Sequence, residues 1–175
     1  IKPFVKEGNF PFLVLYAELL TDDSTEFYNL KKAITLLEEA ITRDDALLYE
    51  DSEYNLSYAK YYLAALYDEE FHIENNIDYT YDPIDESLIN PKSRFSSYKI
   101  KNNTILNLFT DACMGQIGDA CERAALMMAY GRKGIEKNLN GSAFLFSQIF
   151  LKNEYHNPSF YLNLSRDFPE FSNLV

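Results

Sequence analysis

Two cysteines eight positions apart, Cys113 and Cys121, are the residues whose type and spacing most directly suggest chemistry. The residues before Cys113 and those after Cys121 both read as helices, and a short link containing Gly115 and Gly118 joins them. A helical hairpin of this kind brings the end of one helix beside the start of the next, and a disulfide needs Cα atoms only about 4.4–6.8 Å apart. The two thiols could therefore bond. The alternative is a pair of buried free thiols, the commoner arrangement in a cytosolic protein.

No arrangement of side chains in the sequence predicts catalysis or metal binding. His72 and His156 have no Cys or His three or four positions away, as a zinc site on a helix would require. Cys113 could act as a nucleophile only beside a base, and pairing with Cys121 is the simpler interpretation. Acidic runs fall near the expected helix ends, where we interpret them as caps and solvated termini rather than a calcium loop: Asp22–Asp23, Asp44–Asp45, Glu50–Asp51 and Asp68–Glu70. We expect no enzymatic activity, no metal and no cofactor.

The composition is that of one acidic domain spanning residues 1–175, with 47% hydrophobic residues and a formal net charge of −11. An acidic surface repels nucleic-acid phosphates and anionic lipids, so we expect neither as a partner. Apolar runs such as residues 12–17 are too short to cross a bilayer, and no membrane insertion is expected. Ile1 is interpreted as the first residue after signal-peptide cleavage or as an artificial start of the chain.

Helical periodicity recurs along the chain. The clearest case is residues 29–41, whose apolar positions Leu30, Ala33, Ile34, Leu37, Ala40 and Ile41 are spaced as on one face of a helix. Residues 104–113 and 139–151 repeat the pattern, and the equivalent positions Ile105 and Ala143 lie 38 residues apart. Candidates for partner helices are residues 12–20, 57–67 and 120–130, and a last helix is expected to begin at Asn157–Pro158. The sequence therefore predicts repeated helix pairs.

Particular residues within these helices resemble the Sel1-like repeat. They are Lys32-Ala33 and Glu39-Ala40 in a first helix, Leu63-Ala64-Ala65-Leu66-Tyr67 in a second helix, and the stretch from Ala124 to Asn138 with Gly131 and Gly134. The resemblance implies an all-α, Sel1/TPR-like solenoid of three to four antiparallel helix pairs. The spacing of Cys113 and Cys121 resembles one subgroup of the family, the secreted Helicobacter cysteine-rich proteins. That likeness implies a disulfide and an oxidising compartment, so we expect a periplasmic or secreted protein.

Residues 71–102 interrupt the helical pattern with two prolines and little periodicity. A segment of this length without a helical pattern is uncommon inside a domain and is often either functional or disordered. We interpret it as one long insertion between repeats, with Tyr79, Tyr81, Phe95 and Tyr98 as aromatic anchors. It is either a binding loop or a decayed repeat that covers the surface.

The family resemblance implies a non-enzymatic scaffold or adaptor for protein–protein interaction in the bacterial cell envelope, such as part of a flagellar or secretion machine. The alternative is a protein that binds peptidoglycan or other cell-wall fragments, or a weak hydrolase of them; a cytosolic adaptor comes third. We expect the partner to be another protein with a basic or aromatic-accepting surface.

Stacked helical repeats usually bind on the face of their first helices. The predicted partner-binding residues are Glu38, Glu39, Asn107, Thr110 and Asp111 on that face, all exposed, and Tyr79 and Tyr81 in the insertion.

Two further stretches have competing interpretations. The sequence Glu53-Tyr54-Asn55-Leu56-Ser57 fits the acceptor pattern of bacterial N-glycosylation, although such matches are frequent by chance, and we expect it to lie just before a helix. Residues 143–151 are apolar on more than one face, which leaves Phe144 and Leu151 off the expected core side. Either the C-terminal tail covers these two side chains or a partner does.

Overall fold

The computed structural model describes residues 9–43, 46, 48, 52–75, 102–131, 135–151, 166 and 169, and this part of the chain is helical with no β-strand. The helices are α2 (Phe10–Thr21), α3 (Leu30–Ala40), α4 (Ser52–Asn75), α6 (Asn102–Met114), α7 (Gly118–Tyr130) and α8 (Leu139–Leu151). Each of them overlaps a segment that the periodicity predicts as helical. The predicted all-α class is therefore confirmed.

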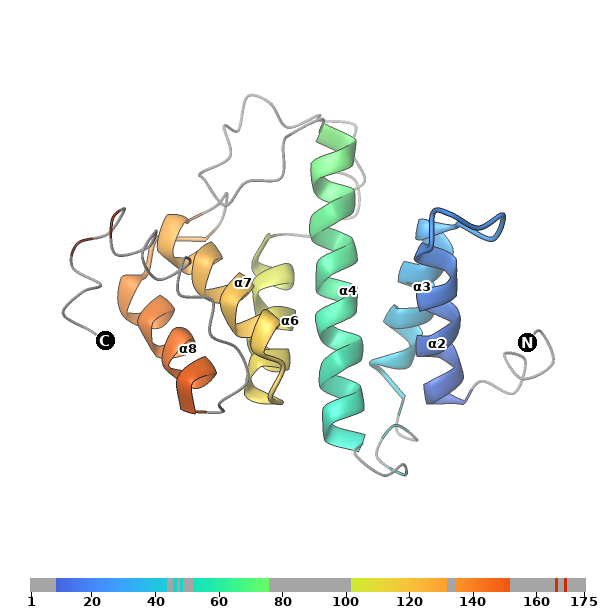
Figure 1. Ribbon diagram of the computed structural model, residues 1–175, viewed down its shortest axis with the longest axis horizontal. Coiled ribbons are helices and arrows are strands. Elements are labelled where there is room, and N and C mark those ends of the chain that lie inside the picture. Colours follow the sequence, from blue (N-terminus) through green and yellow to red (C-terminus); the bar gives the residue numbers. More distant parts are fainter. Residues whose placement is uncertain are drawn as a thin grey trace.

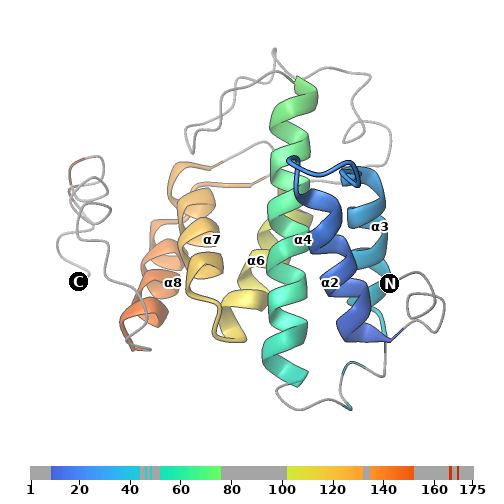
Figure 2. The same ribbon diagram turned by 45° about the vertical axis from the view of Figure 1, so that its right-hand side comes forward.

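Helices that follow one another in the chain also lie side by side in space (Figures 1 and 2). α2 packs on α3, α3 on α4, α4 on α6, α6 on α7 and α7 on α8. In both views α4 stands between the α2–α3 pair and the α6–α7 pair. One continuous cluster of buried apolar side chains runs through all of these helices. α4 is thus the element through which the two ends of the molecule share a core.

The sequence of α3 explains both its start and its buried side. Asn29 caps the helix, because its side-chain oxygen accepts a hydrogen bond from the Lys32 main-chain N–H at 3.1 Å. The main-chain N–H of Asn29 also donates to the Leu20 carbonyl at 2.7 Å, which joins the start of α3 to the end of α2. The apolar positions predicted from periodicity are fully buried at Ala33, Ile34, Leu37 and Ala40. The small alanines at the first and last of these positions let neighbouring helices approach closely.

α4 is longer than its predicted core of residues 57–67 and corrects three expectations. It begins at Ser52, so Asn55 lies in the first turn of the helix and not before it. It continues to Asn75, so the first residues of the predicted insertion are helical. Asp68 is 1% exposed in the interior of α4, and the expectation that it marks a solvated helix end is wrong. Tyr79, Tyr81 and the helix expected from Asn157 lie outside the described residues.

Polar contacts fix α8 against α7. The Ser142 hydroxyl is buried and donates to the Ala125 carbonyl at 2.7 Å. Asn138 donates its main-chain N–H to the Met128 carbonyl at 2.8 Å, and its side-chain oxygen accepts from the Gly141 N–H at 2.9 Å. Gly131 ends α7 with φ +79°, a conformation that glycine adopts without steric cost. Gly131 is one of the two glycines of the Sel1-like stretch, and the other, Gly134, lies outside the described residues.

Two leucines of α2 provide a matched test of this packing. Leu13 is 1% exposed and Leu15 is 58% exposed, although only one residue separates them. We expect Leu13→Ala to lower the free energy of unfolding by about 2–5 kcal/mol, because it leaves a cavity in the core. Leu15→Ala should change it by less than about 0.5 kcal/mol. Urea titrations followed by circular dichroism measure both values, and equal losses would show that α2 is not docked through Leu13.

Candidate protein-binding surfaces

The α6–α7 hairpin brings the two cysteines together. Cys113 lies one residue before the end of α6 and Cys121 lies in the first turn of α7. Their sulfur atoms are at bonding distance, their Cα atoms are 4.6 Å apart, and both side chains are buried. The geometry expected from the helix–link–helix pattern is therefore present. This arrangement closes a short loop, and the described residues contain no free cysteine.

The link between α6 and α7 has the hydrogen bonds of a Schellman motif. The Ile117 N–H donates to the Ala112 carbonyl at 3.1 Å, and the Gln116 N–H donates to the Cys113 carbonyl at 3.0 Å. Gln116 occupies the left-handed position of the motif with φ +79°, where glycine is the usual residue. Gly115, one position earlier, does not occupy the left-handed position. It instead allows α6 to pack closely on α4.

Gly115 is the point of closest approach between the α6–α7 link and α4. A Cβ atom at this position would overlap both the hydroxyl oxygen and the Cβ of Ser57. Ser57 is itself buried, and its hydroxyl donates to the Glu53 carbonyl at 2.8 Å within α4. The side chain of Ser57 therefore has little room to move away. Glycine at position 115 allows α4 and the disulfide hairpin to touch.

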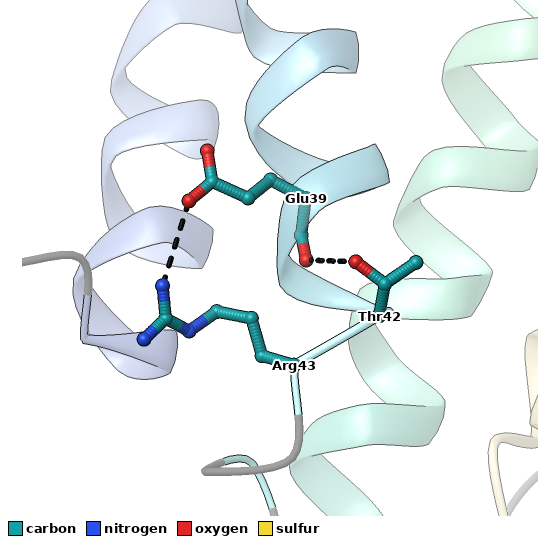
Figure 3. Close-up of polar contacts among 3 residues, drawn as sticks. All are labelled: Glu39, Thr42 and Arg43. Atoms are coloured by element: carbon teal, nitrogen blue, oxygen red, sulfur yellow. Dashed lines mark hydrogen bonds and ion pairs between the residues drawn. The ribbon is translucent and has the colours of Figure 1, made fainter.

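Glu38 and Glu39, predicted to bind a partner, lie near the C-terminal end of α3. Glu39 is exposed, and its carboxylate contacts the Arg43 guanidinium at 3.5 Å while its main-chain oxygen accepts from the Thr42 hydroxyl at 2.8 Å (Figure 3). Glu38 is half-buried rather than exposed, because its carboxylate accepts a hydrogen bond from the Tyr67 hydroxyl at 2.5 Å. Glu38 therefore holds α3 to α4, and Glu39 is the more accessible of the two.

The three residues predicted on α6 also differ in exposure. Asn107 and Asp111 are exposed, whereas Thr110 is half-buried and its hydroxyl oxygen is buried with no hydrogen-bond partner among the described residues. Asp111 forms an ion pair with Lys60 of α4 at 2.9 Å. The expectation that all five first-helix residues are exposed is thus wrong for Glu38 and Thr110.

The predicted residues of α3 and the predicted residues of α6 both contact one side of α4. The two sets are not joined to each other directly. Glu38 reaches α4 at Tyr67 and Asp111 reaches it at Lys60. Tyr67 and Lys60 are seven positions apart, which is about two turns and about 10 Å along one side of a helix. We give the five predicted residues Glu38, Glu39, Asn107, Thr110 and Asp111 one name, the α3–α6 face. Its exposed members are Glu39, Asn107 and Asp111, on the two helices that flank α4.

A second surface was not predicted from the sequence. Tyr54, Tyr58, Tyr61 and Tyr62, which we call the tyrosine stripe, are spaced by four, three and one residues along α4. At 3.6 residues per turn this spacing puts all four on one side of the helix, away from the side that carries Lys60 and Tyr67. Tyr54 is 53% exposed and the other three are half-buried. The spacing was visible in the sequence, but tyrosines in an apolar helix read equally well as core.

The tyrosine stripe contacts α2 along one edge. The Tyr58 and Tyr62 rings are stacked with centroids 6.2 Å apart. The Tyr62 hydroxyl is hydrogen-bonded to the Thr21 hydroxyl, and the Glu18 carboxylate lies near the Tyr58 hydroxyl. Burial raises the pKa of the Tyr58 hydroxyl well above its usual range, and its interaction with Glu18 raises it further. The hydrogen bond to Thr21 therefore holds the Tyr62 ring, on which the Tyr58 ring stacks.

The other edge of the stripe meets α6 and α7. Tyr61 packs on the buried ring of Phe109 with centroids 6.1 Å apart. The Arg123 guanidinium carbon lies 6.0 Å from the centre of the Tyr61 ring and 5.7 Å from that of Phe109. Tyr61 thus connects α4 to the disulfide hairpin.

The disulfide has a measurable consequence for stability. Replacing Cys113 and Cys121 together by alanine should lower the free energy of unfolding by about 2–3 kcal/mol, because the closed loop is short and removes little entropy from the unfolded chain. Mass spectrometry of unreduced peptides from protein made under oxidising conditions should show the two cysteines linked. Two alkylatable thiols without prior reduction would contradict the pairing.

Substitutions of Gln116 and Gly115, two neighbouring residues of the α6–α7 link, should change the free energy of unfolding in opposite directions. Gln116→Gly should raise the free energy of unfolding by about 0.5–1 kcal/mol, since relief of the left-handed cost of about 1–2 kcal/mol exceeds the extra chain entropy of glycine. Gly115→Ala should lower stability, because the new methyl group overlaps Ser57. Thermal unfolding of the two variants beside the native chain tests both signs. A stabilising Gly115→Ala would mean that α4 and the link do not touch as described.

The environment of Glu122 predicts that the stability of the folded state depends on pH. Its burial and the nearby Asp119 raise the pKa of this carboxyl above its ordinary value of 4.5, and Arg123 partly opposes the shift. The folded state then binds this proton more tightly than the unfolded chain does, so the group favours folding at low pH and loses that contribution as pH rises through the raised pKa. Glu122→Gln should melt at a higher temperature than the native chain at pH 7, with a difference that shrinks towards pH 4. The control Glu136→Gln changes an exposed carboxyl. An equal difference at both pH values would exclude the shift.

The described part of the chain contains no group of three His, Cys, Asp or Glu side chains placed to hold a metal ion. None of its helices is both long and apolar enough to cross a membrane. Comparisons of the chain with models of protein families, with curated proteins and with solved structures found no match. A proposal for the function therefore rests on the contacts, burial and charge of the residues described above.

Proposed function

We propose that this chain is a Sel1-like α-solenoid that acts as a non-enzymatic scaffold or adaptor and binds another protein in the periplasm or outside the cell. The observation that carries the proposal is the packing of each helix on its neighbours in the sequence. Such a row of helices exposes long faces on both sides, and repeat proteins use these extended faces for binding. A part in a secretion or flagellar assembly of the envelope is the biological setting that we propose.

The course of the chain supports a solenoid of antiparallel helix pairs. In Figure 1 the colour gradient rises along α2, descends along α3, rises along α4, descends along α6 and rises along α7. Alanines without exposed surface occur where successive helices pack, as at Ala40, Ala64, Ala112 and Ala124. Small residues at these positions permit the close and repeated approach that a solenoid needs.

The cysteine pair supports the proposed compartment. Disulfides persist in the periplasm and outside cells and are rare where glutathione and thioredoxin keep thiols reduced. Cys113 and Cys121 lie at bonding distance at the base of a hairpin, and both are buried. This arrangement is compatible with an oxidising compartment, to which the family resemblance also points.

The α3–α6 face is the proposed partner site, together with Tyr79 and Tyr81. Its exposed members Glu39, Asn107 and Asp111 are acidic or polar, and the chain as a whole carries a net charge of −11. A partner with a basic surface fits this charge, and its association should slow as salt is added. Glu38 and Thr110 are the half-buried members of this face.

The test is capture of a partner from the envelope fraction of the native host, with the full chain as bait. A partner bound at the α3–α6 face should be retained about fivefold less by Glu39→Lys, because the new charge repels a basic surface. Asp23→Lys is the matched control, since it makes the same change of charge at an exposed residue beyond the opposite end of α3. Tyr81→Ala should weaken binding by about 1–3 kcal/mol.

Three results would argue against the proposal. Equal retention by Glu39→Lys and Asp23→Lys would remove the α3–α6 face as the binding site. Turnover of a cell-wall fragment that is abolished by one polar substitution would replace the scaffold with an enzyme. Free thiols at Cys113 and Cys121 in the protein isolated from its host would argue against the compartment.

A further inference from the structure

The tyrosine stripe on α4 is a surface that the proposed function does not use. It lies on the side of α4 opposite to Lys60 and Tyr67, and therefore away from the α3–α6 face. Tyr54 is more than half exposed, and Tyr58, Tyr61 and Tyr62 each keep part of their surface in water. Tyr62 is hydrogen-bonded to α2, Tyr61 packs on α6 and Tyr58 stacks on Tyr62, so these three rings are already ordered before anything binds. Preordered tyrosines offer contact area at a low cost in side-chain entropy.

A cation already lies near one ring of the stripe. The Arg123 guanidinium carbon lies 6.0 Å from the centre of the Tyr61 ring. A second contact of this kind joins α3 to α2 elsewhere, where the Lys32 ammonium lies 4.7 Å from the centre of the Tyr16 ring. The molecule thus stabilises cation–ring contacts of its own. The rings of Tyr54 and Tyr58 present the same chemistry to a partner.

Carboxylates accompany these rings. The Glu18 carboxylate lies near the Tyr58 hydroxyl, and exposed Glu53 precedes Tyr54 in the sequence. A guanidinium group that stacks on a tyrosine can donate to a carboxylate beside it at the same time, because its planar fork has several N–H groups. An ammonium group on a flexible stem gains less from such a site. Arginine is therefore the side chain that this surface suits best.

We propose that the tyrosine stripe binds an extended, arginine-bearing segment of a partner protein, with guanidinium groups stacked on Tyr54 and Tyr58 and paired with Glu53 and Glu18. This inference rests on the proposed function, since it gives the scaffold a second binding surface and names the partner chemistry for it. The net charge of −11 favours approach of a basic segment, and the stacked rings give the contact its preference for arginine.

The test uses the full chain and three synthetic peptides, each with five repeats of arginine–serine, lysine–serine or glutamate–serine. Fluorescence polarisation at low and moderate salt measures the dissociation constants. We expect the arginine peptide to bind at least about fivefold more tightly than the lysine peptide, and the glutamate peptide not to bind. Tyr54→Leu should weaken binding of the arginine peptide about fivefold, because it removes an exposed ring without opening the core.

Two further variants separate the ring from its surroundings. Tyr58→Phe keeps the ring and should keep most of the affinity, whereas Tyr58→Leu should lose affinity about as much as Tyr54→Leu does. Tyr28→Leu is the control, since Tyr28 is a comparably exposed tyrosine in the α2–α3 link. Melting curves show that each variant is folded, and Tyr54→Leu decides the question if Tyr58→Leu does not fold.

Equal affinity for the arginine and lysine peptides, or an unchanged affinity in Tyr54→Leu, would overturn the inference, because attraction by net charge alone would then account for binding. Displacement of the arginine peptide by a tetramer of N-acetylglucosamine would also overturn it and assign the stripe to a glycan. Neither result touches the α3–α6 face. If a captured partner still depends on Glu39 while the peptide fails, the scaffold stands and only the stripe is lost.

Discussion

Burial of one side of α4 is the interaction on which the rest of the molecule depends. Ala59, Leu63, Ala64, Leu66 and Tyr67 are buried along this side, and they face α3 and α6, which do not pack extensively on each other. Without α4 the α2–α3 pair and the α6–α8 group would have no common core. The alanines permit close approach and the leucines fill the space between helices, so apolar burial and tight packing are achieved by the same segment.

The same helix also explains why the molecule has two different outer surfaces. The core side of α4 also carries polar connections towards α3 and α6, and the other side carries tyrosines. Lys60 and Tyr67 fix carboxylates of the flanking helices, whereas Tyr58, Tyr61 and Tyr62 are fixed by α2 and by the disulfide hairpin. A helix of 24 residues is long enough to organise both surfaces at once. The periodicity of its core side alone does not show this.

Local patterns were sufficient to predict most of the helices. The cap at Asn29 and the apolar spacing of α3 both act within a few residues, and the structure follows them closely. The cysteine geometry was equally local, because one hairpin determines it. The ends of α4 were missed, since Tyr-rich and Glu-rich turns carry little periodicity even when they are helical. Asp68 reads as a surface residue by type, and only its position relative to the neighbouring helices makes it buried.

The candidate site was less predictable because it depends on packing between helices. Glu38 and Thr110 occupy positions that a helical wheel leaves outside, yet both are half-buried in the structure. Glycine is the residue type that favours a left-handed turn. Gly115 instead lies against Ser57, and Gln116 adopts the unfavourable positive φ. The tyrosine stripe has a clear spacing whose meaning depends on which side of α4 faces solvent. Spacing within one helix carries no information about that side.

The packing of successive helices has a consequence for the way the chain reaches this structure. Contacts between chain neighbours close short stretches of sequence, and proteins rich in such contacts fold quickly. The disulfide adds to this in the α6–α7 hairpin, because its two helices can no longer separate far once the sulfurs are joined, and this hairpin would be the first to form. Growth would then proceed in both directions, to α8 on one side and through α4 to α3 and α2 on the other.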